Sequence, residues 1–325
     1  MMSLEQIVVL ALIQGITEFL PISSSGHLIL VPALTGWADQ GVVTDMVTNV
    51  GTLAAVIIYF WRDVVSMFWG ALDLLKRKTT LNSQLFFHVL IGTIPIILVG
   101  ILLKLTHLDE HIRSATLVAV NAIVFGVLLY AADTYGLLRR TVVDMNWKSA
   151  LLIGGAQALA LSPGTSRSGI TMTAARGLGF VRSEAARFSF LLSIPANGAA
   201  SLLVIGDAIE SGQTISGPVI LTGLLTFFIA LGTITLLMRM IRTMSFLPFV
   251  IYRVILGGAL LGLIYSGIPL GAVTWLKLLP FLSTRAMLPA KLWNSAGRKF
   301  SLSSSSLNSY FTRSGGSGCL FPCHG

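Results

Sequence analysis

The stretch Ser162-Pro163-Gly164-Thr165-Ser166-Arg167-Ser168-Gly169 interrupts an apolar segment that runs from Trp147 to Phe180. A second polar stretch, Pro21-Ile22-Ser23-Ser24-Ser25-Gly26-His27, interrupts the apolar segment Leu4–Leu34 in the same manner. Irregular polar backbone at membrane depth is tolerated only inside protein or around a water-filled cavity. Each segment is therefore predicted to form a re-entrant hairpin of two half-length helices that enters and leaves on one side.

The composition around these stretches is that of an integral membrane protein. Of the 325 residues, 54% are hydrophobic and only 11% are charged, whereas a soluble domain carries about a quarter charged residues. Residues 1–276 hold 16 basic against 13 acidic residues, and residues 277–325 supply the other six positive charges of the net +9. The basic excess reflects a tail and membrane loops. Soluble enzymes, nucleic-acid binders and disordered proteins are excluded.

Six further segments are apolar over roughly the 20 residues that a membrane-spanning helix needs. They are Val42–Trp61, Leu85–Leu105, Ala115–Asp133, Arg187–Asp207, Val219–Met238 and Phe246–Tyr265. Lys and Arg gather in the loops 62–84 and 134–148, whereas the loops 106–114 and 207–218 carry acidic residues. The excess of positive charge predicts that the first two loops are cytoplasmic. This orientation is consistent only if each hairpin returns to its own side.

The two hairpins also indicate an internal repeat. Four residues recur at a constant offset of 143, namely Gln14, Ser23, Ser25 and Gly26, which match Gln157, Ser166, Ser168 and Gly169. The first repeat is predicted to cover residues 1–135, with its hairpin at 4–34, and the second 136–267, with its hairpin at 147–180. Three spans follow each hairpin, so the halves are inverted, as in many transporters. The alternative is two unrelated breaks rich in Ser and Gly.

The first polar stretch carries groups suited to nucleophilic chemistry. Gln14 and Glu18 are four residues apart and so share one helix face. A carboxylate within an apolar stretch is costly and by default indicates a functional site, although a glutamate near a helix end could instead reach the interface. The serines 23–25 and His27 add nucleophiles and a base. For any single serine, the alternative is a helix cap.

The second polar stretch has the features of a phosphate site. Small and hydroxyl residues leave backbone N–H groups approachable at a helix start, where the dipole also favours an anion. Arg167 adds a planar guanidinium, which suits phosphate; its anionic partner is either Glu18 or a ligand. A carboxylate, a hydroxyl nucleophile and an arginine cradle together describe phosphoryl transfer.

Four other polar residues lie in the apolar spans. Asn49, Asn121 and Asn197 are expected to form hydrogen bonds between helices. Arg253 is expected to extend its long side chain to the cytoplasmic interface.

The segments Gln14–His27 and Pro163–Thr171 resemble the two signature motifs of the bacterial undecaprenyl-diphosphate phosphatases, the bacitracin-resistance protein family. The resemblance covers about residues 1–267. It implies a multi-pass protein of the bacterial inner membrane that hydrolyses undecaprenyl diphosphate to undecaprenyl phosphate and inorganic phosphate. That reaction recycles the lipid carrier for peptidoglycan synthesis and confers resistance to bacitracin.

The resemblance also implies roles for individual residues. Glu18 would bind a divalent cation (Mg²⁺ or Ca²⁺), Ser24 would be the nucleophile, His27 the base or an alternative nucleophile, and Arg167 would hold the phosphate. The implied substrate-binding residues are Ser23, Ser25, Gly164, Ser166, Ser168, Thr171 and Gln14. Many relatives have Glu where this chain has Gln14, which therefore receives a lesser role.

Several alternatives stay open at this point. A polyprenyl-phosphate transporter would use an inverted repeat and an arginine cradle without needing a nucleophile, and an intramembrane serine protease would use serine and histidine on a peptide. A homodimer is possible. The basic, Ser-rich tail 268–325 departs from the family pattern and is expected to be disordered or foreign to the family.

Overall fold

The computed structural model describes residues 2–35, 37, 41–106, 114–136, 139–210 and 216–266. All of them belong to one compact unit that spans residues 1–284. The predicted tail 268–325 lies outside the described residues, as does the side chain of Ser25.

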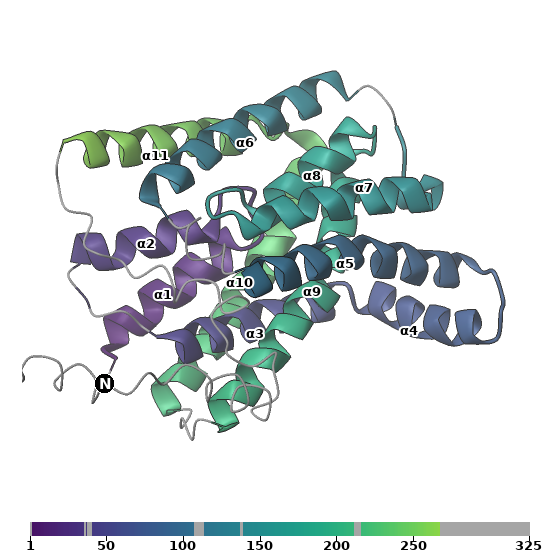
Figure 1. The fold of residues 1–325 in the computed structure, drawn as a ribbon, viewed down its shortest axis with the longest axis horizontal. Coiled ribbons are helices and arrows are strands. Elements are labelled where there is room, and N and C mark those ends of the chain that lie inside the picture. The colour runs from purple at the N-terminus through teal and green to yellow at the C-terminus, as the bar shows by residue number, and fades with distance from the viewer. Residues whose placement is uncertain are drawn as a thin grey trace, which may run out of the picture. The chain divides into compact units, whose positions relative to one another are not determined.

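The described residues are mainly α-helical (Figure 1). The α-helices are α1 (Leu4–Thr17), α2 (Ser24–Thr35), α3 (Val42–Tyr59), α4 (Trp61–Leu75), α5 (Leu81–Thr106), α6 (Ala115–Tyr135), α7 (Trp147–Ala158), α8 (Arg167–Gly177), α9 (Arg182–Glu210), α10 (Gly217–Thr243) and α11 (Leu247–Tyr265). Short 3₁₀ turns, η2 (Val142–Asp144) and η3 (Leu159–Leu161), precede and follow α7. The prediction of an all-helical chain is confirmed for these residues.

Four described helices are long and apolar enough to cross a membrane: α5, α6, α10 and α11. A fifth span results if α3 and α4, which meet at an angle of 84°, count as one. Only 28% of the apolar window of α6 and of α11 is buried inside the protein, so most of their apolar surface faces outward, as a lipid solvent requires. The protein is thus a multi-pass membrane protein. The fourth predicted span, Arg187–Asp207, falls within α9, which is not among these helices.

Both predicted hairpins contain two helices separated by a break, and the two helices contact each other. Both breaks end earlier than predicted, because α2 already begins at Ser24 and α8 at Arg167, and the first break also starts earlier, because α1 ends at Thr17. The reason is visible at α8, where the Ser166 side chain accepts a hydrogen bond from the Gly169 N–H and so allows the helix to begin. The serines expected to extend the breaks begin helices instead.

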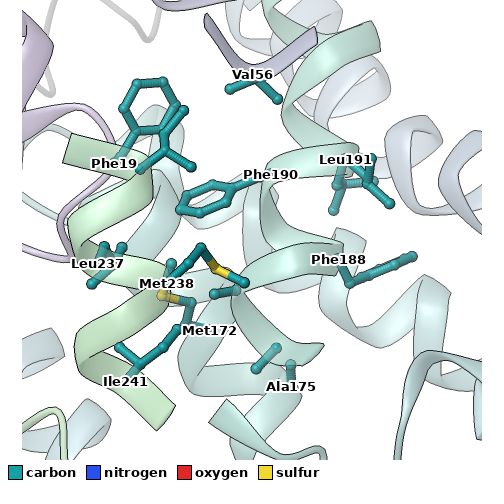
Figure 2. Packing of buried hydrophobic residues seen from close by; sticks show 14 of the residues in the cluster. Phe19, Val56, Met172, Ala175, Phe188, Phe190, Leu191, Leu237, Met238 and Ile241 are labelled. Carbon is teal, nitrogen blue, oxygen red and sulfur yellow. The ribbon is translucent and has the colours of Figure 1, made fainter. Parts of the chain in front are cut away.

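The hairpins pack into the core of the protein. Helix α1 packs along α10 and α7 along α5, while α6 and α11 lie side by side (Figure 1). Phe19, which directly follows Glu18, is 1% exposed and meets Phe190 of α9 edge to face at 5.4 Å. Figure 2 shows this pair above Met172 of α8, in one buried cluster. Both hairpin tips are therefore anchored in the same core.

Candidate active site

A cavity of about 180 Å³ is lined by both hairpin tips together with α3, α5 and α9. Seven of the predicted site residues line it: Gln14, Glu18, Ser23, Ser24, Gly164, Ser166 and Arg167. The fold thus brings together residues that lie about 150 positions apart in the sequence. We refer to this cavity as the tip pocket.

An ion pair joins the two tips inside the pocket. Arg167 Nη2 lies 2.8 Å from Glu18 Oε1, and both side chains are largely buried, with 15% and 12% of their surfaces exposed. Arg167 Nη1 donates a second bond to Asn197 Oδ1 on α9 at 2.8 Å. A guanidinium held on two sides has a fixed orientation, which suits it to bind an anion in the pocket.

The other oxygen of the Glu18 carboxylate organises the first tip. Glu18 Oε2 accepts hydrogen bonds from Ser24 Oγ at 3.2 Å and from Gln14 Nε2 at 3.2 Å. Gln14 Nε2 also donates to Asn49 Oδ1 on α3 at 3.0 Å. A hydroxyl that donates to a carboxylate is the arrangement in which that carboxylate can accept the proton of a nucleophile.

The two tips share an uncommon backbone conformation. Ser23 and Ser166 have positive φ values of 72° and 68°, which few residues other than glycine adopt. Each of these serines directly precedes a helix, α2 or α8. Such conformations persist only when the surrounding structure holds them, and they concentrate at functional sites.

Two predicted substrate-binding residues support the second tip from outside the pocket. Ser168 Oγ lies 3.3 Å from Ser166 Oγ and donates to the Leu20 carbonyl of the first tip at 3.1 Å. Thr171 is completely buried, and its hydroxyl donates to the Arg167 carbonyl at 2.8 Å. These contacts orient the tips, and neither residue lines the tip pocket.

His27 faces a different cavity from the other predicted catalytic residues. It lines an apolar groove between the first hairpin and α11. Its Nδ1 lies 2.8 Å from the Ser23 carbonyl, and its Nε2 contacts the hydroxyl of Tyr252, whose ring stacks on the imidazole with an interplanar angle of 4°. The structure therefore does not bring His27 together with Glu18, Ser24 and Arg167, and its role stays a prediction.

Sequence reasoning assigned no site role to four residues that contact the tips. Asn121 bonds between helices as expected, and its amide donates to Ser162 Oγ and to the Pro163 carbonyl of the second tip, both at 2.8 Å. Asn49 and Asn197 do bond between helices as expected, but their partners are Gln14 and Arg167 of the pocket. Arg253 was expected to reach the cytoplasmic interface, and this is wrong: it is completely buried and bonds backbone carbonyls of both tips. An arginine in an apolar span could have signalled this, since a buried charge needs partners.

The pocket offers oxygen ligands for a divalent cation. Asp45 of α3 lines it together with Glu18, Gln14 and Asn49, and magnesium is commonly bound by one or two carboxylates completed by phosphate oxygens and water. The described residues contain no group of three or more His, Cys, Asp or Glu side chains that could by itself hold a metal ion. The donor set therefore fits a cation whose coordination the substrate and water complete.

Comparisons with known proteins identify the family of this chain. Residues 7–259 match the family model described as bacitracin resistance protein BacA. The chain belongs to this family. An undecaprenyl-diphosphatase of Ruegeria pomeroyi is 46% identical over 267 residues, which cover 82% of this chain and 100% of that protein. A protein of the same name from Roseobacter denitrificans is 46% identical over 267 residues, which cover 82% of this chain and 100% of that protein. Another from Erythrobacter litoralis is 43% identical over 282 residues, which cover 80% of this chain and 99% of that protein. The BacA match includes both hairpin breaks and every residue of the tip pocket.

Proposed function

We propose that this protein is a membrane phosphatase that hydrolyses undecaprenyl diphosphate to undecaprenyl phosphate and inorganic phosphate. The observation that carries the proposal is the Glu18–Arg167 pair, which places a carboxylate, a guanidinium and the Ser24 hydroxyl in one pocket. The family and the names of the relatives support this substrate. They favour hydrolysis over a polyprenyl-phosphate transporter, and a role in carrier recycling and bacitracin resistance follows from the family.

In the reaction that this geometry supports, Ser24 Oγ attacks the terminal phosphorus while Arg167 holds the phosphate oxygens. The bridging P–O bond breaks, undecaprenyl phosphate leaves with its electron pair, and the Ser24 proton passes to Glu18 Oε2, which already accepts that hydrogen bond. Water then attacks the phosphorus of the phosphoserine, the Oγ–P bond breaks and inorganic phosphate leaves, while the proton held by Glu18 returns to Ser24 Oγ. His27 as base or nucleophile is the alternative assignment.

A divalent cation, Mg²⁺ or Ca²⁺, belongs to this proposal for an electrostatic reason. Glu18, Asp45 and Arg167 give the pocket lining a formal charge of −1. A diphosphate would add further negative charge, which a low-dielectric site does not tolerate unpaired. A bound cation would neutralise phosphate oxygens and stabilise the transition state. Glu18, with Asp45, Gln14 and Asn49 nearby, would hold it.

We further propose six spans and two re-entrant hairpins in an inverted repeat, placed in the bacterial inner membrane. Helices α1 and α7 begin at residues 4 and 147, and α2 and α8 at residues 24 and 167, so both pairs differ by 143 positions. The first helix of each hairpin packs on a long helix of the other half. A homodimer stays a prediction, which light scattering of the detergent-solubilised protein tests.

The test of the enzyme is phosphate release from a C55 polyprenyl diphosphate by protein purified in detergent, with and without EDTA. Glu18→Gln and Arg167→Lys are expected to lower kcat/KM by about 10²- to 10⁴-fold, because each removes charge or geometry at the reacting phosphate. Asp63→Asn is the matched control, since it breaks an ion pair with Arg187 outside the pocket. Folded wild type that releases no phosphate with Mg²⁺ present would overturn the proposal.

A further inference from the structure

Arg253 of α11 reaches the backbone of both hairpin tips. Its side chain is 0% exposed. Its Nη1 donates to the Pro21 carbonyl at 3.3 Å, and its Nη2 donates to the carbonyls of Gly164 and Thr165 at 3.1 and 2.9 Å. Pro21 precedes the first left-handed serine by two residues, and Thr165 directly precedes the second. One guanidinium therefore connects the two breaks.

The same guanidinium is fixed to a third element. Arg253 Nε donates to the Ala122 carbonyl of α6 at 3.0 Å, and Nη2 reaches the Asn121 carbonyl at 3.3 Å. Close packing accompanies these bonds, because a Cβ on Gly126 would lie 3.3 Å from the Arg253 Cβ, and a Cβ on Gly169 would lie 2.7 Å from its Nη1. Arg253 is thus held against the first turn of α8.

Arg253 also differs from Arg167 and Arg176 in how its positive charge is compensated. Arg167 pairs with Glu18 and Arg176 with Asp133, whereas no ion pair of Arg253 with a carboxylate occurs in the described part of the chain. Carbonyl oxygens are dipoles and do not cancel a positive charge. The uncompensated charge lies beside the α8 N-terminus, where it would add to the field that attracts an anion.

The carbonyl contacts have a geometric consequence at the second tip. A peptide unit is planar and trans, so its C=O and N–H point in opposite directions. Because Arg253 holds the Thr165 carbonyl, the N–H of Ser166 is turned away from Arg253. Ser166 itself lines the tip pocket. Releasing the carbonyl would free this peptide to rotate and would present carbonyl oxygen to a phosphate.

We propose that Arg253 is a positioning residue of the phosphatase site, which holds the two tips in register and supplies positive charge from behind the phosphate. The inference rests on the proposed function. It assigns to α11 a part in binding the diphosphate although Arg253 does not line the pocket.

Arg253→Lys separates the geometry of the planar guanidinium from its charge. The lysine ammonium keeps the positive charge, but its three donors lie on a compact head. It therefore does not reach carbonyls on three elements at once. The probe is a polyprenyl methylenediphosphonate, a diphosphate analogue that is not hydrolysed. We expect Arg253→Lys to weaken binding of this analogue at least about tenfold and to lower kcat about 10²-fold, the effect of a small misplacement of reacting groups.

The matched control is Arg176→Lys. Arg176 of α8 is also buried, with 6% of its surface exposed, and it too binds backbone carbonyls, those of Phe180 and Gly136. Like Arg253, it does not line the pocket. This control is expected to lower the thermal unfolding midpoint while analogue binding and kcat per folded molecule stay unchanged. Equal losses of binding in both variants, or none in Arg253→Lys, would overturn the proposal.

Three further outcomes are decisive. If Arg253→Lys and Arg253→Gln both fail to fold while Arg176→Lys folds, Arg253 serves folding alone and the proposal is wrong. If wild type binds the analogue but hydrolyses no diphosphate, the proposed enzyme fails, and the role of Arg253 is decided by analogue binding. Wild type that does not bind the analogue would overturn the positioning role as well.

Discussion

The first and second hairpin tips have the same local backbone and different chemistry. In both, a left-handed serine, Ser23 or Ser166, precedes a helix that begins one residue later. The first tip presents Glu18 and Ser24, whereas the second presents Arg167 and a helix N-terminus. Neither tip holds both an acid–nucleophile pair and a phosphate cradle. A repeated backbone whose side chains have diverged therefore yields one site that needs both halves.

The largest expected difference between the tips concerns their serines. Ser24→Ala is expected to lower kcat by about 10³-fold or more, because it removes the proposed nucleophile. Ser166→Ala removes the cap of α8 and the contact of the Ser166 hydroxyl with Ser168 Oγ, and is expected to cost about 1 kcal/mol of stability. Phosphate release and thermal unfolding of both variants measure these effects. Near-wild-type turnover of Ser24→Ala would shift the nucleophile assignment towards His27.

A second prediction concerns the carboxylate that this chain lacks at the first tip. Gln14→Glu places a second carboxylate one helical turn from Glu18. We expect it to reduce the Mg²⁺ concentration for half-maximal activity several-fold, because magnesium binds carboxylate more strongly than amide oxygen. Magnesium titrations of phosphate release measure this change. Gln14→Leu is the control and is expected to raise that concentration. If both substitutions changed the half-maximal Mg²⁺ concentration in the same direction, the result would contradict a cation at this tip.

The matched glutamines offer a third comparison, of stability. Gln14 donates to both Glu18 and Asn49, whereas the amide atoms of Gln157, 143 positions later, are buried with no hydrogen-bond partner in the described structure. Gln157→Met is expected to be neutral or to stabilise by up to about 1 kcal/mol, and Gln14→Met to destabilise by about 1–3 kcal/mol. Thermal unfolding of both variants measures this difference. Equal destabilisation by Gln14→Met and Gln157→Met would contradict it.

The smallest expected effect on stability concerns the residues that precede α7 and α1, at the starts of the two hairpins. Before α7, the Thr141 backbone N–H and hydroxyl bond the Asp144 carboxylate and lower its pKa. A lowered pKa stabilises the fold above the ordinary aspartate value of about 3.9, and this contribution is lost as the pH falls through the lowered pKa.

Asp144→Asn should therefore lower the unfolding midpoint at pH 6 and make little difference at the acidic end of the titration. Before α1, the Ser3 hydroxyl caps the helix by accepting from the Gln6 N–H and carries no charge. Ser3→Ala is the control, and its effect should not depend on pH. A pH-independent effect of Asp144→Asn would contradict the assignment.

Several features of the protein could be predicted from its sequence. Continuous apolar segments predict membrane helices, and α5, α6, α10 and α11 were found where expected. The Pro and Gly punctuation located both breaks, and the isolated charges Glu18 and Arg167 marked the site, because a charge in an apolar segment requires a partner. These inferences succeed because hydropathy and backbone chemistry act locally.

Only the tertiary structure decided which partners meet. It directed His27 to Tyr252 instead of Ser24, made Asn49 and Asn197 supports of the pocket, and buried Arg253 behind both tips. It also bent α3 against α4. The sequence determined that polar groups would be buried, since their residue types and apolar surroundings are local properties. Their pairing depends on how helices far apart in the chain pack, which no local pattern specifies.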